Sequence, residues 1–160
     1  EYYLEFVNAT LGTEKTLEDL LAESENCYLL HKLINLRQGY GTRDHDRIPM
    51  RAMAPVFLDE FASRRDYYLQ YLKEVVGVET DSRSDEELLA ALQEYRLGQY
   101  EKLSDAVYRA KGYDQDAIPL DETLQRLGFT DEAYQRIVRG ARARRRREEL
   151  PDHKPAPAVY

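Results

Sequence analysis

Apolar residues recur at helical spacing along most of this chain, and turn-forming residues separate the helical stretches. Each stretch has apolar positions three or four residues apart, whereas alternation typical of a strand is hardly visible. The pattern predicts helices over residues 1–9, 16–39, 58–76, 84–111 and 121–127, with a last helix after Thr130. We therefore expect an all-α fold, an irregular multi-helix bundle, with one domain over residues 1–150 and a flexible, proline-containing tail over residues 151–160.

Capping residues support these helix boundaries. Thr16 with Asp19, and Ser84 with Glu87, have the spacing of capping boxes, and Thr130 is expected to cap the last helix. Glycines that favour helix termination follow the predicted helices, at Gly39, Gly77, Gly112 and Gly128. The first helix has no start signal, so we expect that the chain was cut from something longer.

The two longest predicted helices carry apolar stripes. The helix over residues 16–39 has so many apolar positions that we expect burial on more than one side. On the helix over residues 84–111, the expected buried positions are Leu88, Leu92, Tyr95, Leu103, Val107 and Tyr108.

Charge is unevenly distributed over the 160 residues, whose formal net charge is −7. The stretch from Arg136 to Arg147 holds seven arginines and no acidic residue. The run Arg142–Arg147 could bind a nucleic acid or an anionic surface, or it could be a solvated helix end that suits the helix dipole and docks on the acidic body. No stacking aromatic is interleaved with the arginines, so we do not expect nucleic acid as a partner.

Cys27 is the single cysteine, which excludes an internal disulfide and fits a reducing, cytoplasmic compartment. With His31 four residues later on one helix face, it could form a metal or thiolate–imidazole pair. Apolar neighbours and the lack of further ligands favour instead a core cysteine and a core histidine. We therefore expect no metal site and no cofactor held by this chain, and no apolar run is long enough to span a membrane.

The most polar loop follows the glycine at the end of the second helix. Its charged side chains are Arg43, Asp44, His45, Asp46, Arg47 and Arg51. One hypothesis is a site for an anionic group, with arginines as bidentate partners and His45 as a proton relay. The other is a surface loop whose charges pair with each other or hold it against a neighbouring domain. No nucleophile elbow, phosphate loop or metal motif is present, so no catalytic residue is assigned.

The order of several segments prompts a comparison with a known family. These segments are residues 8–12, 33–40, 42–49, 103–114, 118–120 and 123–129. In this order they resemble the C-terminal portion of the tungsten-containing aldehyde:ferredoxin oxidoreductases. The form of residues 41–52 is similar to the branch that includes the tungsten subunit of benzoyl-CoA reductases.

The resemblance implies the C-terminal helical domain of a larger oxidoreductase that converts an aldehyde to a carboxylic acid with ferredoxin, or a related reductase. The parent would bind a tungsten or molybdenum bis-pyranopterin and a [4Fe–4S] cluster. Its partners would be the upstream domains of the same polypeptide and ferredoxin or an electron-transfer subunit. Within it, Arg43, Asp44, His45, Asp46, Arg47 and Arg51 are candidates for the substrate channel or the domain interface.

This chain alone is expected to be inactive, and its exposed apolar faces could cause homodimerisation. Two other hypotheses remain at this point. The first is a stand-alone helical adaptor with an acidic body and a basic helix end, and the second is a nucleic-acid binder. The arginine-rich extension after Phe129 has no counterpart in the resemblance, so its role is open.

Overall fold

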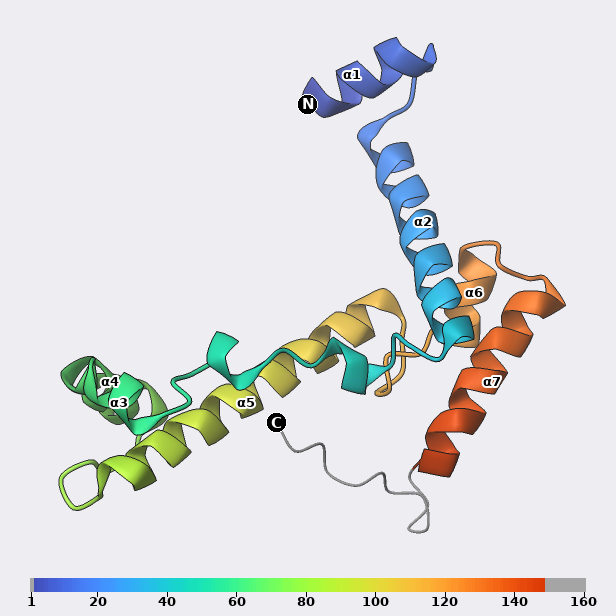
Figure 1. The fold of residues 1–160 in the computed structure, drawn as a ribbon. Helices are drawn as coiled ribbons and strands as arrows, with labels where there is room; N and C mark the ends of the chain where they lie inside the picture. Colours follow the sequence, from blue (N-terminus) through green and yellow to red (C-terminus); the bar gives the residue numbers. More distant parts are fainter. Residues whose placement is uncertain (1, 149–160) are drawn as a thin grey trace. The chain divides into compact units, whose positions relative to one another are not determined.

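The chain is mainly helical in the part that the computed structural model describes, residues 2–148 (Figure 1). No strand occurs within these residues, and the single isolated β-bridge joins Tyr113 to Pro119. This confirms the all-α prediction, whereas the tail predicted over residues 151–160 lies outside the described range. Within the described residues there are two compact units, residues 2–45 with 112–148, and residues 46–111. The single domain over residues 1–150 stays a prediction.

The first unit contains four α-helices: α1 (Tyr2–Leu11), α2 (Leu17–Gln38), α6 (Asp121–Arg126) and α7 (Glu132–Glu148). Its main helix pair is α2 against α7, with α6 nearby (Figure 1). Fully buried side chains from these helices and from the segment before α6 form the apolar interior: Leu29, Leu33, Leu36, Ile118, Leu124, Val138 and Ala141.

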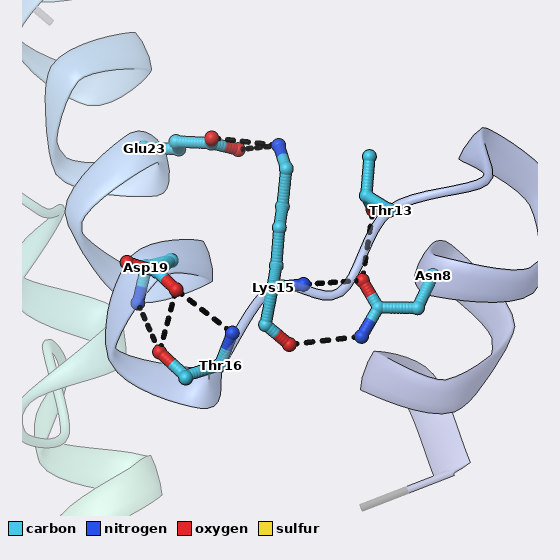
Figure 2. A network of polar contacts seen from close by, with 6 residues as sticks. All are labelled: Asn8, Thr13, Lys15, Thr16, Asp19 and Glu23. Atoms are coloured by element: carbon cyan, nitrogen blue, oxygen red, sulfur yellow. Dashed lines mark hydrogen bonds and ion pairs between the residues drawn. The ribbon is translucent and has the colours of Figure 1, made fainter.

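The connection between α1 and α2 is fixed by one amide side chain (Figure 2). Asn8 donates from Nδ2 to the carbonyl of Lys15 at 2.8 Å, and its Oδ1 accepts from the Lys15 amide at 2.9 Å and from the Thr13 hydroxyl at 2.8 Å. Immediately afterwards, Thr16 and Asp19 form the expected capping box, because each side chain accepts from the other's backbone amide. Local polar bonding therefore decides where α2 begins.

Burial along α2 is narrower than its apolar stripe predicts. Its buried residues are Leu29, Lys32, Leu33 and Leu36, whereas Leu17, Leu21, Tyr28, Leu30 and Ile34 are exposed. The expectation of burial on more than one side is therefore wrong within the described residues. The physical reason is that α2 is amply covered only near its C-terminal half, where α7 packs.

The second unit contains α3 (Leu58–Ala62), α4 (Arg65–Tyr71), a π-helical turn, η3 (Leu72–Val76), and α5 (Asp85–Lys111). The shorter helices pack on the first half of α5 (Figure 1). The buried core there consists of Ala54, Phe61, Leu72, Leu88, Leu89 and Leu92. Leu103 and Val107, expected on the buried side of α5, are instead exposed, Leu103 by 62%.

The helix predicted over residues 58–76 is interrupted. Arg64 leaves helical geometry at φ −134° and ψ 33°, which separates α3 from α4. The Ser63 hydroxyl donates to the carbonyl of Glu60 at 2.7 Å, a side-chain bond that competes with helix continuation. Apolar periodicity continues across the break, so the sequence pattern alone indicated one helix.

Most predicted helix ends are confirmed. Ser84 and Glu87 cap α5 reciprocally, and Gly39 and Gly77 adopt left-handed conformations at the ends of α2 and η3. The prediction of Thr130 as the last cap is wrong by one residue, because Asp131 Oδ1 accepts from the amide of Ala133 at 2.7 Å. The Asp131 carboxylate thus provides the acceptor at the start of α7.

Candidate functional site

The predicted site residues follow α2 and divide between the two units. A short 3₁₀ turn, η1 (Arg43–Asp46), begins the loop, and a second, η2, spans Met50–Ala52. Residues up to His45 belong to the first unit, and residues from Asp46 onward belong to the second. The six residues therefore form two groups, one in each unit.

In the first unit, the loop is bound to the segment that precedes α6. The Arg43 amide donates to the carbonyl of Asp116 at 3.1 Å, and its guanidinium donates to the carbonyl of Gln115 at 3.0 Å. Asp44 forms an ion pair with Arg145 of α7, which also bonds with Asp116 at 3.0 Å. Arg145 thus joins two acidic residues from different segments.

His45 is held locally rather than by the acidic residues next to it. Its Nδ1 lies 2.8 Å from the Thr42 hydroxyl, and its ring meets the Tyr40 ring edge-on at a centroid distance of 5.4 Å. Both contacts come from the preceding turn. The ring is exposed, so it remains accessible from solvent.

A buried lysine supports the same loop. Lys32 of α2 donates from Nζ to the carbonyl of Gly41, and its ammonium lies 5.6 Å from the centre of the Tyr113 ring. Gly41 adopts φ +78°, and a Cβ there would lie 3.1 Å from Cβ of Asn35. A side chain at position 41 would therefore be strained and crowded. Sequence reasoning missed Lys32 because a lysine in an apolar stripe carries no distinctive spacing.

Tyr113 lies in the same buried region. Burial raises the pKa of its phenol to about 12, and the negative charge of Glu25 acts in the same direction. The neutral phenol is the form that this environment favours.

The segment that carries Tyr113, Gln115 and Asp116 is a tight turn. The carboxylate of Asp114 accepts from the amides of Asp116 and Ile118, each at 3.0 Å. Ala117 is buried at φ +62°, a conformation that non-glycine residues rarely adopt. The turn therefore presents the carbonyls of residues 115 and 116 to Arg43 in a fixed geometry.

In the second unit, Asp46 is bound by two tyrosines of α5. Tyr108 donates to Asp46 Oδ2 at 2.9 Å, and Tyr100 donates to its carbonyl. Arg51 forms an ion pair with Glu60, and its guanidinium lies 5.7 Å from the centre of the Phe57 ring. Arg47 is exposed.

Arg51 also lines a hollow of about 610 Å³ within the second unit. Its walls come from the loop after η2, the break between α3 and α4, and α5. The lining residues are Arg51, Ala52, Met53, Ala54, Pro55, Glu60, Ser63, Arg64, Tyr67, Tyr68, Leu92 and Arg96. We call this the Arg64–Arg96 hollow. Sequence reasoning singled out only Arg51 among these residues, because the break that brings in Ser63 and Arg64 was not predicted.

Glu60 is engaged at both carboxylate oxygens. Its Oε2 accepts from the amide of Val56 at 2.8 Å, and its Oε1 bonds with Arg51. These bonds, first that from the Val56 amide, lower the pKa of Glu60 below its ordinary value. Near neutral pH the Glu60 carboxylate is therefore ionised, and both of its oxygens bond with groups of the preceding loop.

Three arginines of α7 bind within the first unit. Arg142 lies 3.1 Å from Asp121 and donates to the carbonyl of Pro119 at 2.9 Å, and Arg144 donates to the carbonyl of Leu36. With Arg145, they dock α7 on acidic and carbonyl groups, as the second interpretation of the arginine run expected. Arg37, Arg136 and Arg144 line a second hollow, of about 410 Å³, between α2 and α7.

Cys27 and His31 are both exposed on α2, so the expectation of a core cysteine and a core histidine is wrong. The buried stripe of α2 instead runs through Leu29, Lys32, Leu33 and Leu36, which lie on another face of the helix. Among residues 2–148, no group of three or more His, Cys, Asp or Glu side chains could hold a metal ion. None of the helices in that range is long and apolar enough to cross a membrane.

Comparison with known proteins adds one finding. The family model described as aldehyde ferredoxin oxidoreductase, domains 2 & 3, matches residues 1–129, a range that includes both units' loop residues but ends before α7. No curated protein and no solved structure matched the chain. Because the matched range covers more than half of the 160 residues, the chain belongs to the aldehyde ferredoxin oxidoreductase family.

Proposed function

We propose that this chain forms the C-terminal helical part of a tungstopterin and iron–sulfur oxidoreductase. The parent would oxidise an aldehyde to a carboxylic acid with ferredoxin as electron acceptor, or carry out a related reduction in the reducing cytoplasm. The observation that carries the proposal is the family match over residues 1–129. The benzoyl-CoA reductase branch is a finer form of the same proposal, resting on the sequence of residues 41–52.

The chain does not fit the cofactors as their binding site. A [4Fe–4S] cluster takes four cysteine ligands, and Cys27 is the single cysteine of the sequence. The described residues likewise offer no cluster of metal-ligating side chains. We therefore propose no redox step for the residues of this chain. Its proposed contribution is to enclose the cofactors of the parent and to form a domain interface.

The proposed interface is an apolar surface on α1 and the first half of α2. Phe6 is 67% exposed and Leu21 is 61% exposed, and Tyr2, Tyr3, Leu11 and Leu17 are exposed as well. Exposed apolar residues of this size and number are typical of surfaces covered by another domain. The proposed occupant is the upstream domain of the same polypeptide, because the matching family model is described as domains 2 & 3, a numbering that presupposes a domain 1.

The reading frame upstream of Glu1 provides the first test. We expect it to encode a segment with clustered cysteines that continues directly into this chain. A natural start codon immediately before Glu1, with no such segment, would remove the proposal.

A substitution in the complete polypeptide provides the second test. Leu21→Glu should lower the thermal stability of the parent and its tungsten content, because a carboxylate would be buried at the interface. In the isolated chain the same change should leave the melting temperature unaltered, since Leu21 is exposed there. Asn26→Glu, which adds the same charge at an exposed position on another face of α2, is the matched control. Equal effects of both variants on the parent would contradict the proposed interface.

The stand-alone adaptor and the nucleic-acid binder have no specific observation in their favour. Both need the arginines of α7 to face a partner, whereas Arg142, Arg144 and Arg145 bond with groups of their own unit. Salt-dependent capture of a partner that is lost on changing Arg144–Arg147 to alanine would restore the adaptor hypothesis.

A further inference from the structure

The Arg64–Arg96 hollow has a charge opposite to that of its surroundings. Residues 46–111 contain 13 acidic and 10 basic side chains, so this part of the chain is acidic. The hollow, in contrast, is lined by three arginines and one glutamate. Arginines gathered in an acidic unit are a feature that helix formation and solubility do not explain.

The single acidic residue of the lining cannot neutralise all three arginines. Glu60 binds Arg51 and the amide of Val56, which occupies both of its oxygens. Among residues 2–148, no carboxylate pairs with the guanidinium of Arg64 or Arg96. Two cations in one hollow therefore lack an acidic partner within the described chain.

The structure holds these two arginines in place by different means. Arg96 projects from α5, and its guanidinium lies 4.4 Å from the centre of the Tyr71 ring, a cation–π contact that orients the planar group. Arg64 sits at the break between α3 and α4, outside regular helix geometry. The position of Arg64 depends on the interruption of the helix expected over residues 58–76, whereas that of Arg96 depends on α5 and the Tyr71 ring.

Apart from Ser63, the remaining lining residues of the hollow are apolar or aromatic. Tyr67 and Tyr68 come from α4, and Leu92, which is buried, comes from α5. The Tyr68 ring is stacked on Phe61 at a centroid distance of 5.3 Å, which fixes its plane. A volume of about 610 Å³ lies in the range of small-molecule sites and exceeds what an inorganic ion needs.

We propose that this hollow binds a small organic phosphate, with the phosphate group on Arg64 and Arg96 and the organic part against Tyr67, Tyr68 and Leu92. Phosphate is the favoured anion because its oxygens accept from several guanidinium groups at once, whereas a single carboxylate is satisfied by one. The proposal is independent of the interface proposed for α1 and α2, since the hollow lies entirely in the second unit.

Titration of the isotopically labelled 160-residue chain with phenyl phosphate, followed by NMR, tests the proposal. We expect saturable binding with shifts of the backbone amides of residues 63–68 and 92–96. Inorganic phosphate and phenol should each bind at least about tenfold more weakly, because each supplies half of the contacts. Phenylacetate should also bind about tenfold more weakly, and equal affinity for it would overturn the assignment to phosphate.

Arginine variants distinguish this site from the other cationic hollow. Arg64→Gln and Arg96→Gln should each weaken phenyl phosphate binding about tenfold or more, the effect of one lost charge-assisted hydrogen bond. Arg136→Gln, in the hollow between α2 and α7, is the matched control and should leave binding unchanged. Loss of binding in Arg136→Gln alone, or no saturable binding by the unaltered chain, would overturn the proposal.

The Arg64→Gln variant keeps the test independent of folding. Arg64 is exposed and bonds with no carboxylate among the described residues, so its replacement should leave the circular dichroism spectrum and melting temperature unchanged. Arg96 supports the Tyr71 ring, and its variant is interpreted only where the spectrum matches that of the unaltered chain. Unaltered affinity in a folded Arg64→Gln chain would contradict the proposed phosphate contact.

Discussion

The hydroxyl of Thr123 donates to the carbonyl of Gly112 at 2.6 Å and occupies the space that a side chain at position 112 would need. A Cβ on Gly112 would lie 2.2 Å from Oγ1 of Thr123, and Gly112 already adopts φ +69°. This contact fixes the backbone of residue 112 against α6, close to the turn that holds Tyr113 and Asp116. Glycine is required here both by backbone conformation and by the approach of Thr123.

Replacing Gly112 by alanine should therefore be strongly destabilising. We expect a loss of about 2–3 kcal/mol in the free energy of unfolding, because backbone strain and a steric clash act together. Gly128→Ala is the matched control: Gly128 has φ +79° but no atom within 4 Å of the place where a Cβ would stand, so strain acts alone and about 1 kcal/mol should be lost. Equal losses in chemical denaturation would mean that Thr123 rotates away without cost.

Gly98 should respond in the opposite direction. It lies inside α5, its backbone is helical, and a Cβ added there would meet nothing within 4 Å. Gly98→Ala should raise the free energy of unfolding by about 0.5–1 kcal/mol, because alanine loses less backbone entropy on helix formation. The same denaturation experiment measures it. A decrease would contradict the prediction, since no steric cost is expected at this position.

Arg145 should contribute more to stability than its neighbours in the arginine run. Its side chain is 19% exposed and bonds with both Asp44 and Asp116, so Arg145→Ala would leave two carboxylates without their cation. We expect a loss of about 1–2 kcal/mol, reduced from the value for fully buried pairs by solvent screening at Asp44.

Arg146→Ala is the control for this effect, since Arg146 is exposed, and it should change stability by less than about 0.5 kcal/mol. A double-mutant cycle with Asp116→Ala isolates the pairwise energy. Additive effects of Arg145→Ala and Asp116→Ala would show that the pair does not couple.

Tyr113 should make the stability of the first unit fall at high pH. Its folded pKa is about 12, above the ordinary value of 10.0, because burial disfavours the phenolate. Because the phenol of Tyr113 holds its proton more tightly in the folded state, its effect on the free energy of unfolding is constant below the unfolded pKa of about 10. This stabilisation decreases as pH rises from about 10 to about 12. Burial also raises the pKa of Tyr71, so absorbance near 295 nm should show more than one tyrosine that titrates late. Tyr113→Phe should remove the component near pH 12, and an unchanged titration curve in that variant would contradict the assignment.

The limits of helices follow from local chemistry, and the sequence predicts them well for that reason. The Thr16–Asp19 and Ser84–Glu87 boxes and the left-handed Gly39 and Gly77 involve residues within a few positions of each other. The break at Arg64 is local as well, but the hydrogen bond from Ser63 to Glu60 opposes a continuous apolar pattern, and the pattern misleads there.

Partners distant in sequence could not be predicted in the same way. Arg145 reaches Asp44, and Arg96 lines one hollow with Arg64, because α7 and α5 bring their residues to loops that are separate in the chain. Charged residues with ordinary helical spacing give no sign of which loop they will contact. The Arg64–Arg96 hollow was missed for this reason, although one of its members, Arg51, belonged to the predicted set.

The sequence by itself determined that this protein is helical, where most of its helices begin and end, and to which family it belongs, since these depend on short-range periodicity, caps and ordered motifs. Only the tertiary structure decided which apolar residues are buried and which charges meet. Leu21 and Leu103 look like core residues in their helical patterns but are exposed, because burial depends on whether another element covers that face. That information lies in the packing of distant segments rather than in the pattern of any one helix.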